Sequence, residues 1–340
     1  MPTVILGGGI IGSAIAYYLS ETHPPGDIHI IESSTALFSS ASGYAAGFLA
    51  KDWFSPDVAS LGELSFGLHE RLAIEYGGVE RWGYMKGMAL SYDATIKRGS
   101  GSQGDEWMDR GGSRAEMASR STLGSEMGAP AWLTVRSGVE VERISDVDTA
   151  QVFLTGYSLV LRSPRHTLEH EQQTYGGRCH AIFTENPFSC GFSPEIFSRQ
   201  GGEIYIAGLN DPDMPLPGLA EESRNLIDRD ELRRLKAVST QLMGRLVDED
   251  AGVTDVNMDD LEVLREGLCF RPVTHRGTPV VCRVDDDFLG DGLKTDGHGG
   301  IFVASGHGPW GISLSLGTGR VVADMVEGVR PRADVSKLGL

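Results

Sequence analysis

The residues with the clearest chemical pattern are three glycines near the N-terminus, spaced as Gly7-x-Gly9-x-x-Gly12. In such a pattern the first glycine permits a tight turn, the second lets backbone amides approach a pyrophosphate, and the third lets a helix pack closely on a strand. The N–H groups of Ile10, Ile11 and Gly12 would then open a helix whose positive dipole end faces the phosphates. The alternative is a tight turn with close packing and no ligand.

Glu32 completes the pattern of a dinucleotide site. A short apolar run at Thr3–Leu6 precedes the glycines, and a second run at Ile28–Ile31 ends directly before Glu32. Runs of this kind are typical of buried parallel strands. A carboxylate at the end of the second strand can accept hydrogen bonds from both ribose hydroxyls of an adenosine, and it disfavours a 2′-phosphate. The combined context predicts a dinucleotide other than NADP.

The bulk composition limits the classes of partner. The chain has 340 residues, with 30 basic against 47 acidic side chains and a net charge of −17, which argues against nucleic acid and anionic membrane surfaces. The N-terminus lacks the features of a signal peptide, and no nearby apolar run is long enough to span a bilayer. The four cysteines form no close pair, which favours reduced thiols. We therefore expect a cytoplasmic protein that acts on a small molecule; the oligomeric state cannot be read from the sequence.

The two ends of the chain are similar in pattern, and the middle is different. Strand-like runs at 152–154, 158–161, 181–183 and 203–207 follow one another without helices, which predicts an antiparallel sheet. A further run at 301–304 precedes a glycine-rich turn and a closing helix. The expected fold is α/β (α+β overall), a Rossmann-type domain with an inserted antiparallel β-rich domain. The predicted ranges are 1–60 and 285–330 for the first domain, 61–284 for the second, helices at 64–76 and 226–247, and a flexible excursion at 99–130.

Several motifs in this order resemble the D-amino-acid-oxidase-like FAD oxidoreductases, the family that includes glycine and sarcosine oxidases, and in particular a eukaryotic branch of it. The resemblance covers most of the chain. The motifs that carry it are Gly7–Leu19, Glu32, Ser40-Ala-Ser-Gly43, Ala46-Gly47, Gly47–Trp53, Leu64–His69, Ser193–Phe197, Glu203–Gly208, Arg271-Pro-x-Thr-x-x-Gly-x-Pro279 and Gly306-His-Gly-Pro-Trp-Gly-Ile312.

The resemblance implies FAD as the cofactor. Hydroxyl and amide donors on the loop after Glu32 would pass the pyrophosphate and the ribityl chain, and small residues would let the backbone approach the isoalloxazine. The turn that opens the last helix would point N–H groups at the flavin C2=O, although a simple strand-to-helix turn is the alternative. The residues implied in these roles are Ser40, Ser42, Gly43, Ala46, Gly47, Gly306, His307, Gly308, Trp310, Gly311 and Ile312.

The candidate catalytic residues are Arg271 and His307. In the family an arginine at the Arg-Pro position often binds the substrate carboxylate, for which a planar bidentate guanidinium is suited; a surface or ion-paired arginine is the alternative. His307 could bond flavin or substrate, or be a satisfied structural histidine. Cys269 stands where some members attach flavin covalently, but a buried, inert thiol is favoured. His69 is expected in the core or on the surface.

One departure from the family pattern concerns the stretch before Val152. In the family a further part of the FAD domain follows the region of Asp148–Gln151, including a strand against the cofactor, and here it is missing. The first sheet would lose strands, and apolar surface would face water. The first hypothesis is an enzyme that oxidises the C–N bond of an amino acid or small amine through hydride transfer to flavin N5, with oxygen as acceptor. The second is an inactive relative with a binding or regulatory role, for instance in trafficking, and the third is an NAD-linked dehydrogenase.

Overall fold

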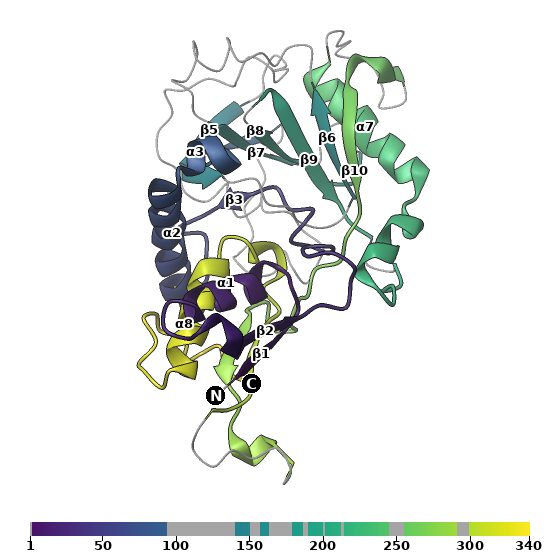
Figure 1. The fold of residues 1–340 in the computed structure, drawn as a ribbon. Coiled ribbons are helices and arrows are strands. Elements are labelled where there is room, and N and C mark those ends of the chain that lie inside the picture. The colour runs from purple at the N-terminus through teal and green to yellow at the C-terminus, as the bar shows by residue number, and fades with distance from the viewer. Residues whose placement is uncertain are drawn as a thin grey trace.

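The computed structural model describes residues 2–93, 140–149, 157–162, 179–185, 190–199, 201–211, 214–244, 255–290 and 299–340. Figure 1 shows a lower part built from both ends of the chain and an upper part dominated by one large sheet. The mixed α/β architecture agrees with the predicted fold class. The excursion predicted at 99–130 and the strand predicted at 152–154 lie outside the described residues.

The N-terminal residues form a strand–helix–strand unit. β1 (Thr3–Leu6) and β2 (Ile28–Ile31) pair in parallel, and α1 (Ile10–Leu19) connects them. The short 3₁₀ helix η1 (Pro25–Asp27) lies between α1 and β2, where proline cannot continue an α-helix. Both strands predicted from the apolar runs are therefore confirmed, and the glycine turn lies between the first strand and the helix.

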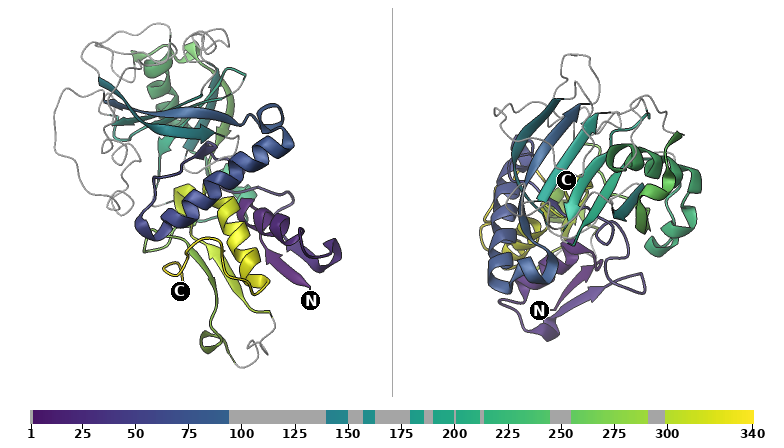
Figure 2. Two further views of the ribbon diagram at one scale, coloured as in Figure 1. Left: turned by 90° about the vertical axis from the view of Figure 1, so that its left-hand side faces the viewer. Right: turned by 90° about the horizontal axis from the view of Figure 1, so that it is seen from above.

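The C-terminal end of the chain returns to this unit. β11 (Val280–Arg283) and β12 (Phe302–Ser305) form an antiparallel pair, and α8 (Ser315–Val326) packs on α1. A Cβ at Gly319 of α8 would lie 2.6 Å from the carbonyl carbon of Ala14 on α1, so the helices approach this closely only with glycine at that position. The views in Figures 1 and 2 show the two helices side by side. Segments from both ends of the chain thus pack together, and we refer to them below as the unit formed by the chain ends.

The long helix α2 (Pro56–Tyr76) leads from this unit to the large sheet. It packs on α8 at Gly317, where a Cβ would lie 2.8 Å from the carbonyl oxygen of Leu61. The helix begins earlier than the predicted start at Leu64, because the helix-initiating proline at position 56 precedes the apolar periodicity. It ends at Gly77, which adopts a left-handed conformation with φ +67°.

The large sheet has eight strands in the order β10-β6-β9-β8-β7-β4-β5-β3. All neighbouring strands are antiparallel except β4 and β7, which are parallel, so the predicted antiparallel sheet is confirmed with one exception. The strands are β3 (Phe48–Leu49), β4 (Met85–Asp93), β5 (Glu140–Thr149), β6 (Tyr157–Arg162), β7 (Cys179–Glu185), β8 (Glu195–Arg199), β9 (Glu203–Leu209) and β10 (Glu262–Gly267).

The two faces of this sheet are covered by different elements. Along β9 the side chains alternate: Ile204 and Ile206 pack in a cluster with α7 (Arg229–Met243), whereas Tyr205 and Ala207 join the core shared with α1 and α8. Figure 2 shows α7 along one side of the sheet. The remaining short helices are α3 (Gly78–Trp82), η3 (Ala220–Leu226), η5 (Met258–Asp260), η6 (Asp286–Phe288) and η7 (Gly308–Trp310).

The packing of α2 and β11 concerns the predicted boundaries of the inserted domain. The range 61–284 would assign most of α2 and all of β11 to the inserted domain, although α2 packs on α8 and β11 pairs with β12. These contacts favour assigning both elements to the unit formed by the chain ends. The division itself stays a prediction.

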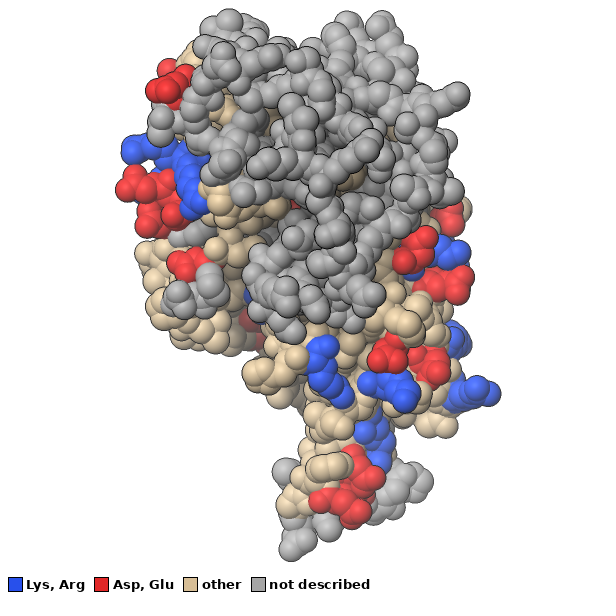
Figure 3. Space-filling view, turned by 180° about the vertical axis from the view of Figure 1, so that it is seen from behind, with Lys and Arg blue, Asp and Glu red and all other residues tan. Residues whose placement is uncertain are grey.

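The described surface carries charges of both signs. Acidic and basic side chains are interspersed on the face in Figure 3, so the described part of that face has no continuous basic surface of the kind that binds nucleic acid. Among the helices in the described ranges, none combines the length and the apolar character needed to cross a membrane.

Candidate functional site

The glycine turn after β1 has the geometry that its spacing predicts. Gly7 adopts φ +107°, and its N–H donates to the carbonyl of Ile31 on β2 at 2.8 Å. A Cβ at Gly12 would lie 2.0 Å from the carbonyl oxygen of Gly7, a distance that no side chain tolerates. Gly9 directly precedes α1 as its N-cap residue. The turn therefore brings the N-terminus of α1 against the end of β1, where the first N–H groups of a helix have no intrahelical acceptor.

Glu32 and Ser42 converge on this turn. The N–H of Gly8 donates to Glu32 Oε2 at 2.6 Å, and the N–H of Ser34 donates to Oε1 at 2.8 Å. These backbone hydrogen bonds hold the pKa of the Glu32 carboxyl below its usual value, so the group is ionised. Ser42 Oγ accepts from the N–H of Ile10 at 3.0 Å. Two predicted residues from the following loop thus lie beside the glycine turn.

The loop itself is fixed by close backbone contacts. The N–H of Phe38 donates to the carbonyl of Gly8 at 3.3 Å, and Phe38 adopts φ +59°, which is uncommon for a bulky residue. A Cβ at Gly43 would lie 2.0 Å from the carbonyl oxygen of Phe38, and the Gly43 N–H donates to the carbonyl of Ser40 at 2.9 Å. Glycine is therefore required at position 43 for the chain to fold over the turn.

Three side chains of the large sheet, which the sequence analysis did not single out, hold the carbonyls of residues 43–45. Arg265 Nη2 donates to the first carbonyl at 2.8 Å, the Tyr205 hydroxyl donates to the second at 3.2 Å, and Arg199 Nη2 donates to the third at 3.2 Å. Arg199 is buried, and desolvation lowers the pKa of its guanidinium. Strand periodicity indicates that such residues face a core, but nothing in the sequence indicates which carbonyls they contact.

The closing glycine turn lies beside the Arg-Pro motif. The N–H of Gly308 donates to the carbonyl of Pro272 at 2.9 Å, and Val273 forms an isolated antiparallel bridge with His307. Gly306 adopts φ +76°. The structure thus brings together the two C-terminal motifs, which are separated by more than 30 residues in the sequence. The expectation that the turn opens the last helix directly is wrong in detail, because η7 intervenes and α8 begins at Ser315.

His307, which is buried, and His69, which is half-buried, both contact the last segment. His307 Nε2 lies 3.0 Å from Thr318 Oγ1 on α8, and burial lowers the pKa of His307 to about 4. His69 Nε2 lies 3.0 Å from the carbonyl oxygen of Ile312, and burial lowers its pKa to about 4 as well. Both rings are neutral at physiological pH, and each is bonded to a different point of the closing segment.

Arg271 and Cys269 differ in their accessibility. Arg271 is half-buried, and its Nη2 donates to Asn210 Oδ1 at 2.7 Å. Cys269 is buried, and desolvation raises the pKa of its thiol to about 12. Because a thiolate is the reactive form, this environment matches the inert thiol that the sequence analysis favoured.

An aromatic cluster connects the closing turn to the large sheet. Trp310 of the closing turn lies 5.1 Å from Phe54 and 6.3 Å from Trp53 between ring centroids. Phe48 extends the cluster to Phe183 on β7, at 5.6 Å. The small residues of the predicted flavin loop are buried directly before it in the chain: Ala45, Ala46 and Gly47.

The residue set around the first glycine turn fits the diphosphate and ribose of a dinucleotide. The family model described as "FAD dependent oxidoreductase" matches this chain at residues 3–139 and 136–325. The chain belongs to this family. The match comes in two pieces, which overlap at residues 136–139. The motif order places the missing segment later in the chain, directly before Val152.

Individual proteins are similar to this chain over nearly its whole length. "Putative oxidoreductase C1F5.03c" of Schizosaccharomyces pombe is 26% identical over 385 residues, covering 95% of this chain and 93% of that protein. The glycine oxidase of Geobacillus kaustophilus is similar in fold, with a TM-score of 0.64, 17% identity, and coverage of 99% of this chain and 97% of that one. The iminodiacetate oxidase of Chelativorans sp. BNC1 has a TM-score of 0.63 at 13% identity, covering 99% and 98%.

Proposed function

We propose that this family member binds FAD and oxidises the C–N bond of an amino acid or related small amine, with molecular oxygen as the electron acceptor. The observation that carries the proposal is the convergence of the glycine turn, the Glu32 carboxylate and the Ser42 hydroxyl at the N-terminus of α1. A turn without a ligand needs close packing alone. It does not need an ionised carboxylate and a hydroxyl at the same helix end.

The proposed cofactor-binding roles follow from the atoms that these residues offer. The N–H groups of Ile11 and Gly12 would donate to the pyrophosphate, and the absence of a side chain at Gly9 leaves the approach open. Glu32 already accepts three hydrogen bonds, from the N–H groups of Gly8 and Ser34 and from the Ser33 hydroxyl, so its orientation is fixed for ribose hydroxyls. Further contacts are proposed for Ser40, Gly43, Ala46, Gly47, Gly306, Gly308, Trp310, Gly311 and Ile312.

Bound FAD would supply the acceptor for a hydride that leaves the carbon next to the amine nitrogen. The nitrogen loses a proton, the resulting imine is hydrolysed by water, and oxygen takes up the two electrons with two protons as hydrogen peroxide. We assign the substrate carboxylate to Arg271, whose planar guanidinium offers two parallel donors. We assign His307 a positioning role, since its ring bonds Thr318 and so fixes the closing turn.

Anaerobic reduction tests this proposal. The purified protein, loaded with FAD, is mixed without oxygen with individual amino acids and small amines, and the flavin absorbance band is followed. The proposal expects at least one of them to bleach the band, and admission of oxygen to restore it with release of hydrogen peroxide. A protein that binds FAD but is bleached by no compound of this class would contradict the substrate assignment.

Two variants at position 271 test the carboxylate assignment. Arg271→Ala should raise the substrate concentration for half-maximal bleaching at least tenfold. Arg271→Lys keeps the charge but not the paired donors, so its half-saturating concentration should lie between those of the alanine variant and the wild type. The bound flavin spectrum should stay the same in both. Equal half-saturating concentrations in all three proteins would show that Arg271 does not bind the substrate carboxylate.

A non-catalytic binding role remains the second candidate. It is favoured by one observation, the exposure of apolar side chains on β1 and β2, where Leu6 is 80% and Ile31 is 56% exposed. This candidate expects Arg271→Ala to leave cellular behaviour unchanged while the protein stays folded. A cellular phenotype of folded Arg271→Ala protein would count against it.

A further inference from the structure

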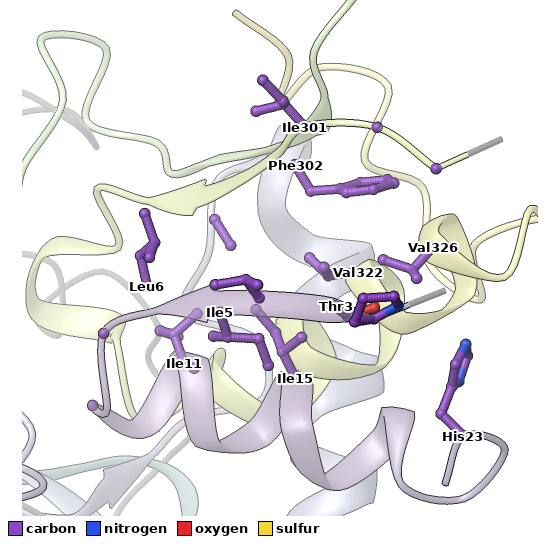
Figure 4. A pocket seen from close by; sticks show the side chains of 18 of the residues that line it. Thr3, Ile5, Leu6, Ile11, Ile15, His23, Ile301, Phe302, Val322 and Val326 are labelled. Atoms are coloured by element: carbon purple, nitrogen blue, oxygen red, sulfur yellow. The ribbon is translucent and has the colours of Figure 1, made fainter. Parts of the chain in front are cut away.

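A cavity of about 910 Å³ lies between two strands of the unit formed by the chain ends. Figure 4 shows β1 along one side and the segment of Ile301 and Phe302 on the other, with side chains of α1 and α8 beside them. Ile15 of α1 and Val326 of α8 are among the lining residues. The cavity therefore has a helical layer on one side and the edge of a strand on each of two others.

The backbone of β1 points its unpaired groups into this cavity. In a parallel pair, alternate residues direct their N–H and C=O groups to opposite edges of the strand. The N–H of Gly7 bonds the Ile31 carbonyl on β2, so Ile5 directs its backbone groups to β2 as well. Val4 and Leu6, which lie between them, direct their N–H and C=O groups to the opposite edge, which lines the cavity.

The same reasoning applies to β12. The N–H of Val284 donates to the carbonyl of Ile301 at 2.8 Å, so Ile301 and Val303 direct their backbone groups to β11. Phe302 and Ala304 direct theirs to the other edge, and both line the cavity. Two strand edges thus face one space.

Away from the glycine turn and Ser42, which belong to the proposed FAD site, the chemistry of the cavity between β1 and β12 favours an extended peptide over other ligands. Its lining residues include no Asp, Glu, Lys or Arg, so it offers no charged partner to an ionic ligand. An apolar small molecule would bury the backbone groups of both strands without hydrogen bonds, at a loss for each group. A peptide strand pairs with both edges and lays alternate apolar side chains on α1 and α8.

We propose that this cavity binds an extended apolar segment of a partner protein as a β-strand inserted between β1 and β12. The alignment with the Schizosaccharomyces pombe relative runs over 385 residues, more than the 340 of this chain, so that relative contains residues without a counterpart here. In this chain, a second polypeptide can supply the strand that such residues would form. One end of the cavity reaches Gly7, Gly9 and Ser42 of the proposed FAD site. The tests therefore use protein without flavin, and their outcome does not depend on whether FAD binds.

The first test uses a fluorescein-labelled octapeptide of alternating valine and threonine, with binding followed by fluorescence anisotropy. The control peptide has the same sequence with N-methyl groups on alternate residues, which removes the N–H donors along one edge and keeps the side chains. We expect the unmodified peptide to saturate the protein and the control to bind at least tenfold more weakly. Equal binding of the two peptides, or no saturable binding of either, would overturn the proposal.

The second test changes the protein. Val4→Pro removes the N–H that points into the cavity and leaves the hydrogen bonds to β2, whereas Val4→Thr keeps the donor. We expect Val4→Pro to weaken peptide binding at least tenfold, and Val4→Thr to bind as the wild type does. Unchanged binding by a folded Val4→Pro protein would refute the inserted strand.

Hydrogen exchange gives a readout on the wild-type protein, whatever the folding of the variants. On peptide binding the amides of Val4, Leu6, Phe302 and Ala304 should become protected together. Peptide binding without protection of these four amides would contradict the assignment. Self-association in sedimentation, with protection of the same amides in the absence of peptide, would identify a second copy as the occupant and overturn the choice of a different partner.

Discussion

The large sheet and the β1–β2 pair differ in how far their apolar side chains are buried. Ile204 and Ile206 of β9 are fully buried on the face of the sheet that α7 covers. On the small pair, Val4 is 55% and Leu6 is 80% exposed. The glycine turn attached to this pair is nevertheless fixed by backbone contacts. The difference indicates that local backbone contacts maintain the glycine turn, whereas the large sheet and the helices provide most of the stability of the molecule.

The largest effect is expected from the core of the large sheet. Ile206→Ala removes a fully buried side chain from the cluster with α7 and should lower the free energy of unfolding by about 3–4 kcal/mol. The matched variant Ile206→Val should lose only about 1 kcal/mol. Urea denaturation measures both. A loss below 1 kcal/mol for the alanine variant would mean that this sheet is not the main source of stability.

The next effect concerns the contact between the chain ends. Arg320 of α8 forms an ion pair with Glu21, stacks on the Tyr18 ring at 5.2 Å, and lies 3.5 Å from Asp324, which is buried. Arg320→Ala should lower the free energy of unfolding by about 3 kcal/mol, because it leaves the Asp324 carboxylate buried beside a lost partner. Arg332→Ala serves as the control, since that exposed arginine is 3.9 Å from Asp324 and should contribute less than about 1 kcal/mol. Equal losses would contradict this account.

The histidines of the closing segment predict a dependence on pH. His69 and His307 have pKa values of about 4 in the folded protein, against 6.5 in the unfolded chain. Between these values the unfolded state binds more protons, so the free energy of unfolding falls as pH falls, by up to about 1.4 kcal/mol per histidine and pH unit. His307→Gln should flatten the slope of this free energy between pH 6 and 4, and exposed His275→Gln should not. Identical slopes in the wild type and both variants would show that the buried His307 ring does not resist protonation.

The smallest effect is expected on the exposed face of β1. Leu6→Ala removes a side chain that is 80% exposed and should change the free energy of unfolding by less than about 0.5 kcal/mol. The comparison with Ile206→Ala, measured in the same urea series, then gives the contrast between the two regions directly. A loss above 1.5 kcal/mol would mean that Leu6 is covered in solution.

The sequence predicted those features that depend on local backbone requirements. The strand, glycine turn and helix over residues 3–19 were predictable because Gly7 and Gly12 have no substitute at their positions, and the apolar run of β2 ended where expected. Pairing between distant segments was not predictable in this way. The proximity of Pro272 to Gly308 depends on how the large sheet returns the chain to α8.

The least predictable features were contacts of side chains with backbone carbonyls. Arg199, Tyr205 and Arg265 hold the 43–45 stretch, but only the folded sheet places them there. The start of α2 was missed because the buried Val58 and Leu61 of its first turns lie outside the four-residue spacing that begins at Leu64. The missing segment predicted exposed apolar surface, and the exposed side chains of Val4 and Leu6 agree with this prediction. The cavity beside β1 could not be predicted from the sequence, because its lining comes from distant segments of the chain.

The most direct test of the central claim is the affinity for FAD, measured by calorimetric titration of the wild type and of Gly12→Ala. The account predicts one FAD per chain, and binding at least tenfold weaker in the variant, because its Cβ would lie 2.0 Å from the Gly7 carbonyl oxygen and force the turn to move. Gly67→Ala is the control, since a Cβ there meets nothing within 4 Å, and it should bind FAD as the wild type does. A wild-type protein that takes up no FAD, or a folded Gly12→Ala protein that binds it equally well, would contradict the claim.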